Sequence, residues 1–501
     1  MKNAVEVQRI VCILLCLVAV FYASISPIYV NDFWLQTKVG EIIFQTHTVP
    51  RTLLFPFTEI SSEPFNAHEW LASLLFYGAV HIGGESTLPI LQGLLGCTIF
   101  GLLVAVAFAC NGRSLAWAMI LALAAMWSEN YRHCLRPELL ALVLMLGYWT
   151  LLERLRHTQH IGAIVVLLLL VVFWSNVHGS FILAPVMAFI YLLGMAVDSG
   201  LKLSTDGAGV TRQAMLRMGS LSLLVLLCTL ANPFGVELLH FVWSFSTENY
   251  LREHVPEWAS TWEARNSDAR GFWIGMVLLA LTWIAWGYQV LHRKATGVDT
   301  LLLLAFTLLA LRSIRFVVYI GFIGAYIGAG ILRTRHRKAS GQNHVYGACS
   351  LFASCTLALT IQYGNANYAT PSEGPPNVKF SERLVQILAM PQLYGNVLNS
   401  LELGSELVYR AYPRLKPSID PRIDSYGLDY ILFQFELLQN DALLKEFVER
   451  YDVRYVLLDS VRFSTFQNRS AWKDGEWKVF YKDGKEVLLQ RSDIQIPVPI
   501  Y

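Results

Sequence analysis

Long apolar runs separated by short polar loops recur along the chain up to about residue 363. A run of about 20 apolar residues is long enough to cross the hydrocarbon core of a bilayer as a helix. The pattern therefore predicts a polytopic α-helical membrane protein with about eleven transmembrane helices. The predicted spans are roughly 8–29, 87–110, 115–130, 137–152, 161–176, 181–198, 218–232, 271–291, 299–312, 316–332 and 344–363.

One further apolar run, residues 69–82, is too short to be counted among these spans, because it has only about 14 residues. Counting it would place Arg154 and Arg156 on the outer side of the membrane. Treated as a helix that lies in the membrane interface, it leaves the N-terminus and the basic loops in the cytoplasm. The first outer loop, residues 30–86, is then expected to contain juxtamembrane helices, and the tail lies outside the cytoplasm.

The tail of the chain has the pattern of a separate soluble α/β domain. Its β-rich runs are 416–419, 454–458, 477–481 and 486–490, and its helical patterns are 379–390, 400–412 and 428–451. A stretch rich in Pro, Gly, Ser and Asn, residues 365–377, is the predicted linker. We therefore expect a transmembrane domain over 1–363 and an extracytoplasmic α/β domain over 364–501.

The composition fits a membrane protein and gives no reason to expect a nucleic-acid partner. The 501 residues are 54% hydrophobic and 15% charged, with a net charge of +2. Most cysteines lie in apolar runs and the tail has none, which argues against a disulfide framework. The first apolar run follows Lys2 and Arg9, and no small-residue cleavage site precedes Asp32, so we interpret it as a retained span.

On this topology the polar motifs inside or beside the spans fall on the outer face. They are Asp32, His68-Glu69, Arg136-Pro137-Glu138, Asn176-Val177-His178-Gly179, Asn232-Pro233, Glu257-Trp258 and Arg312-Ser313-Ile314-Arg315. Carboxylates at the edge of a membrane bundle are costly to place and mark functional sites. The inner loops offer little besides positive charge, so the outer face is the predicted active face.

The order of these motifs resembles that of the GT-C membrane glycosyltransferases, which use polyprenyl-phosphate-linked sugars. More narrowly, it is similar to a bacterial GT-C-like group with an extracytoplasmic C-terminal domain. The matching residues are Asp32-Phe33-Trp34, Glu69-Trp70-Leu71, Arg136-Pro137, Asn176-Val177-His178-Gly179, Asn232-Pro233-Phe234-Gly235, Glu257-Trp258, Arg312-Ser313-Ile314-Arg315, Ile419-Asp420-Pro421-Arg422 and Tyr426-Gly427. Together they cover nearly the whole chain.

The resemblance implies transfer of a sugar from a polyprenyl-phosphate donor to an acceptor on the outer side of a bacterial cytoplasmic membrane. The acceptor is a glycan, a lipid or a protein, and pilin-like proteins are among the protein acceptors left open. Many GT-C enzymes carry an adjacent acidic pair in the first loop, whereas Asn31 precedes Asp32 here. A paired-carboxylate metal site is therefore doubtful at this position, and a divalent cation (Mg or Mn) is an optional cofactor only.

This chemistry needs a base that accepts the proton of the acceptor hydroxyl, and a carboxylate can do that. Asp32 is the predicted base, although an aspartate here could also cap the following helix. Glu69 and His68 are the other catalytic candidates. The alternative for Glu69 is an interfacial charge near a helix start, and for His68 a local hydrogen bond.

The leaving phosphate must be neutralised, and arginine binds phosphate oxygens bidentately. Arg136, Arg312 and Arg315 are the candidates, and the alternative for each is a side chain that reaches to the lipid headgroups. The two arginines of the last motif are three residues apart and would share one face of a helical turn.

Three further residues are candidates for binding the sugar or the acceptor. Asn176 and His178 lie in a tight turn made by Gly179, and Glu257 lies in the long loop 233–270. Polar capping of a buried turn is the alternative for the first two. A non-catalytic membrane scaffold, or a transporter for envelope glycan assembly, is the competing class of function. A transporter would carry its polar residues near the middle of the membrane in two related halves, and the sequence shows no such repeat.

Overall fold

In the computed structural model the chain divides into two compact units, each described here by itself. Unit 1 contains Met1–Pro27, Ser86–Cys134 and Glu138–Thr370, and unit 2 contains Ile28–Glu85, Leu135–Pro137 and Pro371–Tyr501. The structure describes residues 2–25, 31–111, 114–130, 133–158, 160–201, 210–247, 258–265, 269–331, 342–369, 380–494 and 496.

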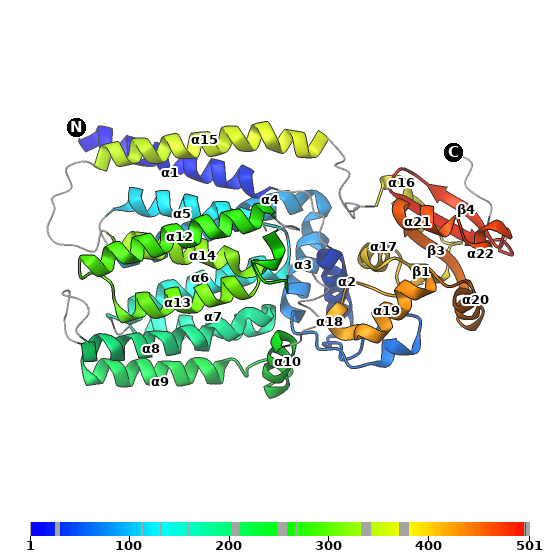
Figure 1. The fold of residues 1–501 in the computed structure, drawn as a ribbon, viewed down its shortest axis with the longest axis horizontal. Coiled ribbons are helices and arrows are strands. Elements are labelled where there is room, and N and C mark those ends of the chain that lie inside the picture. Colours follow the sequence, from blue (N-terminus) through cyan, green and yellow to red (C-terminus); the bar gives the residue numbers. More distant parts are fainter. Residues whose placement is uncertain are drawn as a thin grey trace. The chain divides into compact units, whose positions relative to one another are not determined.

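Unit 1 is a bundle of helices (Figure 1). Its described helices are α1 (Lys2–Ser24), α4 (Leu88–Asn111), α5 (Leu115–Asn130), α6 (Pro137–Leu155), α7 (Ile161–Val177), α8 (Leu183–Leu201), α9 (Arg212–Cys228), α10 (Val236–Thr247), α12 (Ala269–Leu291), α13 (Gly297–Arg312), α14 (Val317–Gly330) and α15 (Gln342–Ala369). The first and the last of these, α1 and α15, pack along each other.

The centre of the bundle is α14, whose residues are buried at nearly every position. Glycines let its neighbours approach closely, since a side chain at Gly321 would collide with Ser128 of α5 and one at Gly328 would meet Leu121 of the same helix. Small residues have this role in membrane helix packing because lipid supplies no hydrophobic force between helices.

Four described helices are long and apolar enough to cross a membrane, and several shorter apolar helices accompany them. The four are Glu6–Ser24, Glu85–Cys110, Gly179–Gly200 and Gly271–Leu291. The apolar helices identify a multi-pass membrane protein. The count of eleven spans and their orientation stay predictions.

Unit 2 joins the first loop to the tail of the chain. The loop forms α2 (Asn31–Thr46), a 3₁₀ turn at Glu59–Ser62 and α3 (Trp70–Gly83). The described tail consists of α16 (Glu382–Leu388), β1 (Gly395–Asn399), α17 (Gly404–Ala411), β2 (Leu415–Pro417), α18 (Ile423–Tyr426), α19 (Leu428–Leu437), α20 (Asp441–Arg450), β3 (Val453–Asp459), α21 (Ser460–Phe466), α22 (Ser470–Lys473), β4 (Trp477–Lys482) and β5 (Glu486–Arg491).

The tail is built on one five-stranded sheet with the order β2-β1-β3-β5-β4. β1 pairs in parallel with β2 and β3, whereas β5 runs antiparallel to β3 and β4. β3 is buried along most of its length, as a central strand covered by helices on both faces should be. The α/β character predicted for the tail is therefore present.

Two details of the tail differ from the sequence prediction. The strand β1 was not predicted, because Gly395-Asn396 at its start reads as a turn. The single helix expected over 428–451 is two helices. Asn440 breaks it, because its side chain accepts a hydrogen bond from the backbone N–H of Leu443 and so caps a new helix.

Candidate active site

Helices α2 and α3 lie against each other, and Gly40 sets how closely they approach. A side chain at position 40 would collide with the carbonyl of Ser73 and with Tyr77 of α3. The close packing lets side chains of one helix bond to the other directly. Gln36 of α2 and Glu69, which precedes α3, make such a contact.

The carboxylate of Glu69 is held by a short chain of hydrogen bonds. Gln36 Nε2 donates to Glu69 Oε2 at 2.6 Å, and the Ser73 hydroxyl donates to Gln36 Oε1. Gln36 is four residues after Asp32, so both side chains leave the same face of α2. Gln36 therefore lies on the same face of α2 as Asp32 and bonds to the Glu69 carboxylate.

His68 lies beside this carboxylate, with its Nε2 3.8 Å from Glu69 Oε1. Its Nδ1 is 3.1 Å from the carbonyl oxygen of Asn66, which can only accept a hydrogen bond. In the neutral ring this contact places the proton on Nδ1. His68 is thus oriented by a local bond and still faces Glu69.

Asp32 lies in the first turn of α2, and its Oδ2 is 3.7 Å from Nε of Arg136. The side chain of Asp32 is 45% exposed and that of Arg136 is 26% exposed, so both are accessible to a substrate. The alternative role that the sequence left open was capping of this helix. Asp32 lies inside the first turn, where its charge complements the helix dipole. Unit 2 therefore gathers four predicted residues, Asp32, His68, Glu69 and Arg136.

Unit 1 holds the remaining predicted residues that the structure describes. The Arg315 guanidinium lies 3.8 Å from Glu138 Oε2 and stacks on the Trp258 ring at 4.1 Å from its centroid. Its side chain is only 13% exposed. Glu257, which precedes this tryptophan, lies outside the described residues.

The expectation that Arg312 and Arg315 share one face of a helical turn is wrong. α13 ends at Arg312, and Ser313 has an extended backbone with φ −153° and ψ 137°. Arg315 lies in the short 3₁₀ turn that follows. The extended residue rotates the chain between the two arginines, so they leave different local elements.

Asn176 and His178 end α7 in a network of local hydrogen bonds. Asn176 Nδ2 donates to the carbonyl of Val172 at 2.7 Å and to that of Ala231 at 2.8 Å, which ties the end of α7 to the turn after α9. His178 Nδ1 contacts the hydroxyl of Ser180 at 2.8 Å. These contacts explain how the turn is held and leave the role in sugar binding a prediction.

Comparison with solved structures shows which fold this is. ArnT from Cupriavidus metallidurans, solved with undecaprenyl phosphate, aligns over 98% of this chain and 98% of its own at 12% identity, with a TM-score of 0.56. The Archaeoglobus fulgidus oligosaccharyltransferase, solved with a tethered acceptor peptide, aligns over 98% of this chain and 75% of its own at 12% identity, with a TM-score of 0.53. The chain has the GT-C fold. No protein-family model and no curated protein matches the sequence.

The GT-C fold raises the question of a metal, since another structure of the archaeal oligosaccharyltransferase was solved with Zn and sulfate. Among the described residues, the potential ligand atoms of Asp32, His68 and Glu69 do not form a group of three that all lie within 4.8 Å of one another. A divalent cation (Mg or Mn) stays an optional prediction, and we derive no step through a metal.

Sequence reasoning missed how the tail of the chain packs on the helix of Asp32. Arg410 of α17 forms a bidentate ion pair with Glu85, and its guanidinium lies 4.9 Å from the centroid of the Trp34 ring. Trp34 is two residues after Asp32 and is also stacked on Tyr409 at 4.8 Å. The tail therefore fixes the position of α2. These contacts join residues more than 300 positions apart, so no local pattern could have revealed them.

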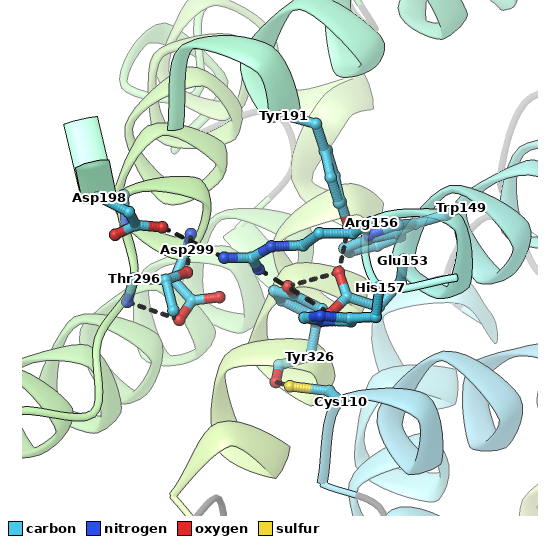
Figure 2. Close-up of polar contacts among 11 residues, drawn as sticks. Cys110, Trp149, Glu153, Arg156, His157, Tyr191, Asp198, Thr296, Asp299 and Tyr326 are labelled. Carbon is cyan, nitrogen blue, oxygen red and sulfur yellow. Dashed lines mark hydrogen bonds and ion pairs between the residues drawn. The ribbon is translucent and has the colours of Figure 1, made fainter. Parts of the chain in front are cut away.

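A second group of missed residues forms a buried polar cluster at α6 in unit 1 (Figure 2). Glu153 Oε2 accepts hydrogen bonds from Tyr191 at 2.7 Å and from Tyr326 at 3.0 Å. Arg156 pairs with Asp198 at 3.2 Å, and Asp198 accepts a hydrogen bond from the N–H of Gly297 at 2.6 Å. The cluster connects α6, α8, α13 and α14, and such satisfied polar networks fix the register of packed helices. We assign it a structural role in the GT-C bundle.

Two buried carboxyl groups of the tail make unit 2 sensitive to pH. Burial raises the pKa of Glu486 to about 8, and the nearby Asp483 raises it further. Burial raises the pKa of Glu406 to about 7, against the lowering effects of the Phe380 N–H and Arg410. The folded state holds these two protons more tightly than the unfolded state. The protonated carboxyl groups therefore contribute fully to the free energy of unfolding below the unfolded pKa of 4.5, and this contribution is lost as the pH rises through 7 to 8.

We expect the thermal unfolding temperature of the full-length protein in detergent to decrease as the pH is raised from 6 to 9. Glu486→Gln keeps the side chain neutral at every pH, so it should flatten this profile. The exposed Glu436→Gln, in the same domain, is the control and should leave the slope unchanged. A Glu486→Gln profile as steep as that of the native protein would contradict the assignment.

Proposed function

We propose that the protein is a glycosyltransferase that moves a sugar from a polyprenyl-phosphate donor to an acceptor hydroxyl on the outer side of a bacterial cytoplasmic membrane. The observation that carries the proposal is the grouping of Asp32, His68, Glu69 and Arg136 in one unit of a chain with the GT-C fold. A base and a phosphate-binding cation are the two groups that this reaction requires.

In the proposed reaction the acceptor oxygen attacks the anomeric carbon of the sugar. The bond between that carbon and the phosphate oxygen breaks, and the phosphate leaves with the bonding electron pair. The acceptor proton passes to the carboxylate of Asp32, and a single displacement of this kind inverts the anomeric configuration. Glu69 and His68 orient the acceptor, and Arg136 neutralises the leaving phosphate.

The direct test is transfer in vitro. The purified full-length protein, in detergent, is mixed with a panel of polyprenyl-phosphate sugars and candidate glycan, lipid and peptide acceptors, and products are identified by mass. We expect one donor to yield an acceptor heavier by one sugar. A protein that binds donors but yields no product with any of them would favour the competing scaffold or transporter function.

The three arginines can be separated by Arg→Lys substitution. At a bidentate phosphate site lysine supplies charge without the planar fork, so we expect Arg136→Lys to weaken donor affinity on the order of tenfold to a hundredfold. At a site that only reaches to the headgroups lysine is equivalent, and the change is silent. Donor titration of Arg136→Lys, Arg312→Lys and Arg315→Lys, one at a time, measures this.

The exposed Arg51→Lys in the first loop is the matched control and should leave donor affinity unchanged. Unchanged affinity in Arg136→Lys together with a large loss in Arg315→Lys would move the phosphate site to unit 1. Asn176, His178 and Glu257 remain proposed contacts to the sugar or the acceptor, and their alanine variants belong in the same titration series.

A further inference from the structure

Three cysteines gather inside the bundle where its first and last helices meet. Cys12 and Cys16 are one turn apart on the same face of α1, and Cys349 lies opposite them on α15. All three side chains are fully buried. Their sulfur atoms lie within 4.8 Å of one another, and those of Cys16 and Cys349 are 3.7 Å apart.

This spacing is also the one that a metal site with several thiolate ligands requires. Two thiolates bound to one zinc ion at about 2.3 Å with tetrahedral angles lie about 3.8 Å apart. The Cys16 and Cys349 sulfurs are already at this separation, and the Cys12 sulfur lies within 4.8 Å of both. We propose that Cys12, Cys16 and Cys349 bind a thiophilic d¹⁰ metal cation, Zn(II) or Cu(I).

The donor set determines this class of cation. Thiolate sulfur is a soft ligand that selects Zn(II) and Cu(I), whereas Mg(II) and Ca(II) need oxygen ligands. Binding displaces thiol protons to the solvent and changes no oxidation state. Each thiol loses its proton when it ligates, so binding through three sulfurs releases three protons. Zn(II) then leaves a site of net charge −1 and Cu(I) one of −2, so Zn(II) suits these apolar surroundings better.

The site would act on the bundle rather than on sugar transfer. Its ligands come from α1 and α15, so the cation would join the two ends of the transmembrane chain. A cation that binds only the folded state stabilises it by mass action. The inference is independent of the proposed glycosyltransferase activity, because its readouts are metal binding and stability.

The test uses the full-length protein in detergent, kept anaerobic with a reductant that contains no thiol. Zn(II), Cu(I) and the spectroscopic probe Cd(II) are titrated separately. We expect one equivalent of Zn(II) or Cu(I) to bind with release of three protons. Cd(II) should give sulfur-to-metal charge-transfer absorption, and the bound metal should raise the unfolding temperature.

The variant Cys16→Ala/Cys349→Ala should lose the absorption band and weaken binding by about a hundredfold or more. Cys355→Ala, which removes an exposed cysteine of the same helix α15, is the matched control and should bind normally. If the double variant does not fold, alkylation of the native protein still decides, since bound metal should protect the three clustered thiols and not Cys355.

Three results would overturn the inference. The first is equal metal affinity in the native protein and the double variant. The second is that neither cation binds to the native protein. The third is a Cys16–Cys349 disulfide in the isolated protein, together with no metal binding after that disulfide is reduced.

Discussion

Asp32→Asn should abolish sugar transfer while the protein stays folded and inserted in the membrane. The amide keeps the shape of the side chain but cannot accept the proton of the acceptor hydroxyl. Loss of a general base typically lowers turnover on the order of 10²–10⁴-fold. Donor affinity should change little, because Arg136 and not Asp32 is proposed to bind the phosphate. The measurement is turnover at saturating donor, together with a donor titration.

Glu41→Gln is the matched control for this prediction. Glu41 lies on the same helix α2, pairs with Lys38 at 2.9 Å and is 28% exposed. Its neutralisation should leave turnover within about twofold, since Glu41 has no role in the proposed reaction. Turnover near the native rate in a well-folded Asp32→Asn protein would remove Asp32 from the mechanism and make Glu69 the next candidate.

Arg422→Met should destabilise unit 2 by about 3–5 kcal/mol, because it leaves the buried Asp420 without its partner. Arg422 Nε and Nη2 bond to the two oxygens of Asp420 at 2.8 and 2.5 Å. Its Nη2 also donates to the carbonyl of Leu53 in the first loop at 2.6 Å. Asp420 accepts a further bond from Tyr426 at 2.6 Å. The Ile419-Asp420-Pro421-Arg422 motif, one of those that resemble the GT-C-like group, therefore bonds the tail to the first loop.

The full-length protein is unfolded with a chemical denaturant, and unfolding is monitored by protease cleavage of the first loop. The shift of the unfolding midpoint measures this loss of stability. Arg450→Met is a sharp control, because Arg450 also joins the tail to the loop through Glu59, but both side chains are largely exposed. It should cost less than about 1 kcal/mol. The double variant Asp420→Asn/Arg422→Met removes both charges and should recover part of the stability. Equal losses in Arg422→Met and Arg450→Met would show that burial of the pair is unimportant.

Much of the local structure could be predicted from the sequence. The apolar runs predicted the described helices of unit 1 except α10, which lies in the segment 233–270 that was predicted to be a loop. The short run 69–82 is the helix α3. Short β-rich runs predicted four of the five strands of the tail. Periodicity reports on burial of one face of an element, so it succeeds where a helix or strand has a regular environment.

Contacts between distant segments could not be predicted in the same way. Gln36 is an ordinary polar residue in the sequence, and its role depends on the closeness of α2 and α3 that Gly40 permits. The prediction that Arg312 and Arg315 share one face of a helical turn was wrong, because residue spacing does not reveal the extended backbone of Ser313. Residue type and spacing suggested Asp32 and Glu69, whereas the groups that orient them required coordinates.

Unit 2 also has a consequence for the order in which the chain is made. Its first segment ends at Glu85, but its partner begins only at Pro371. At 5–20 residues per second the ribosome needs roughly 15–60 s to reach the second segment. During this interval Phe55, which packs against Tyr412, and Phe57, which packs against Phe447, have no tail to cover them. The growing protein must therefore carry an apolar, unfinished loop through the insertion of most of its transmembrane helices.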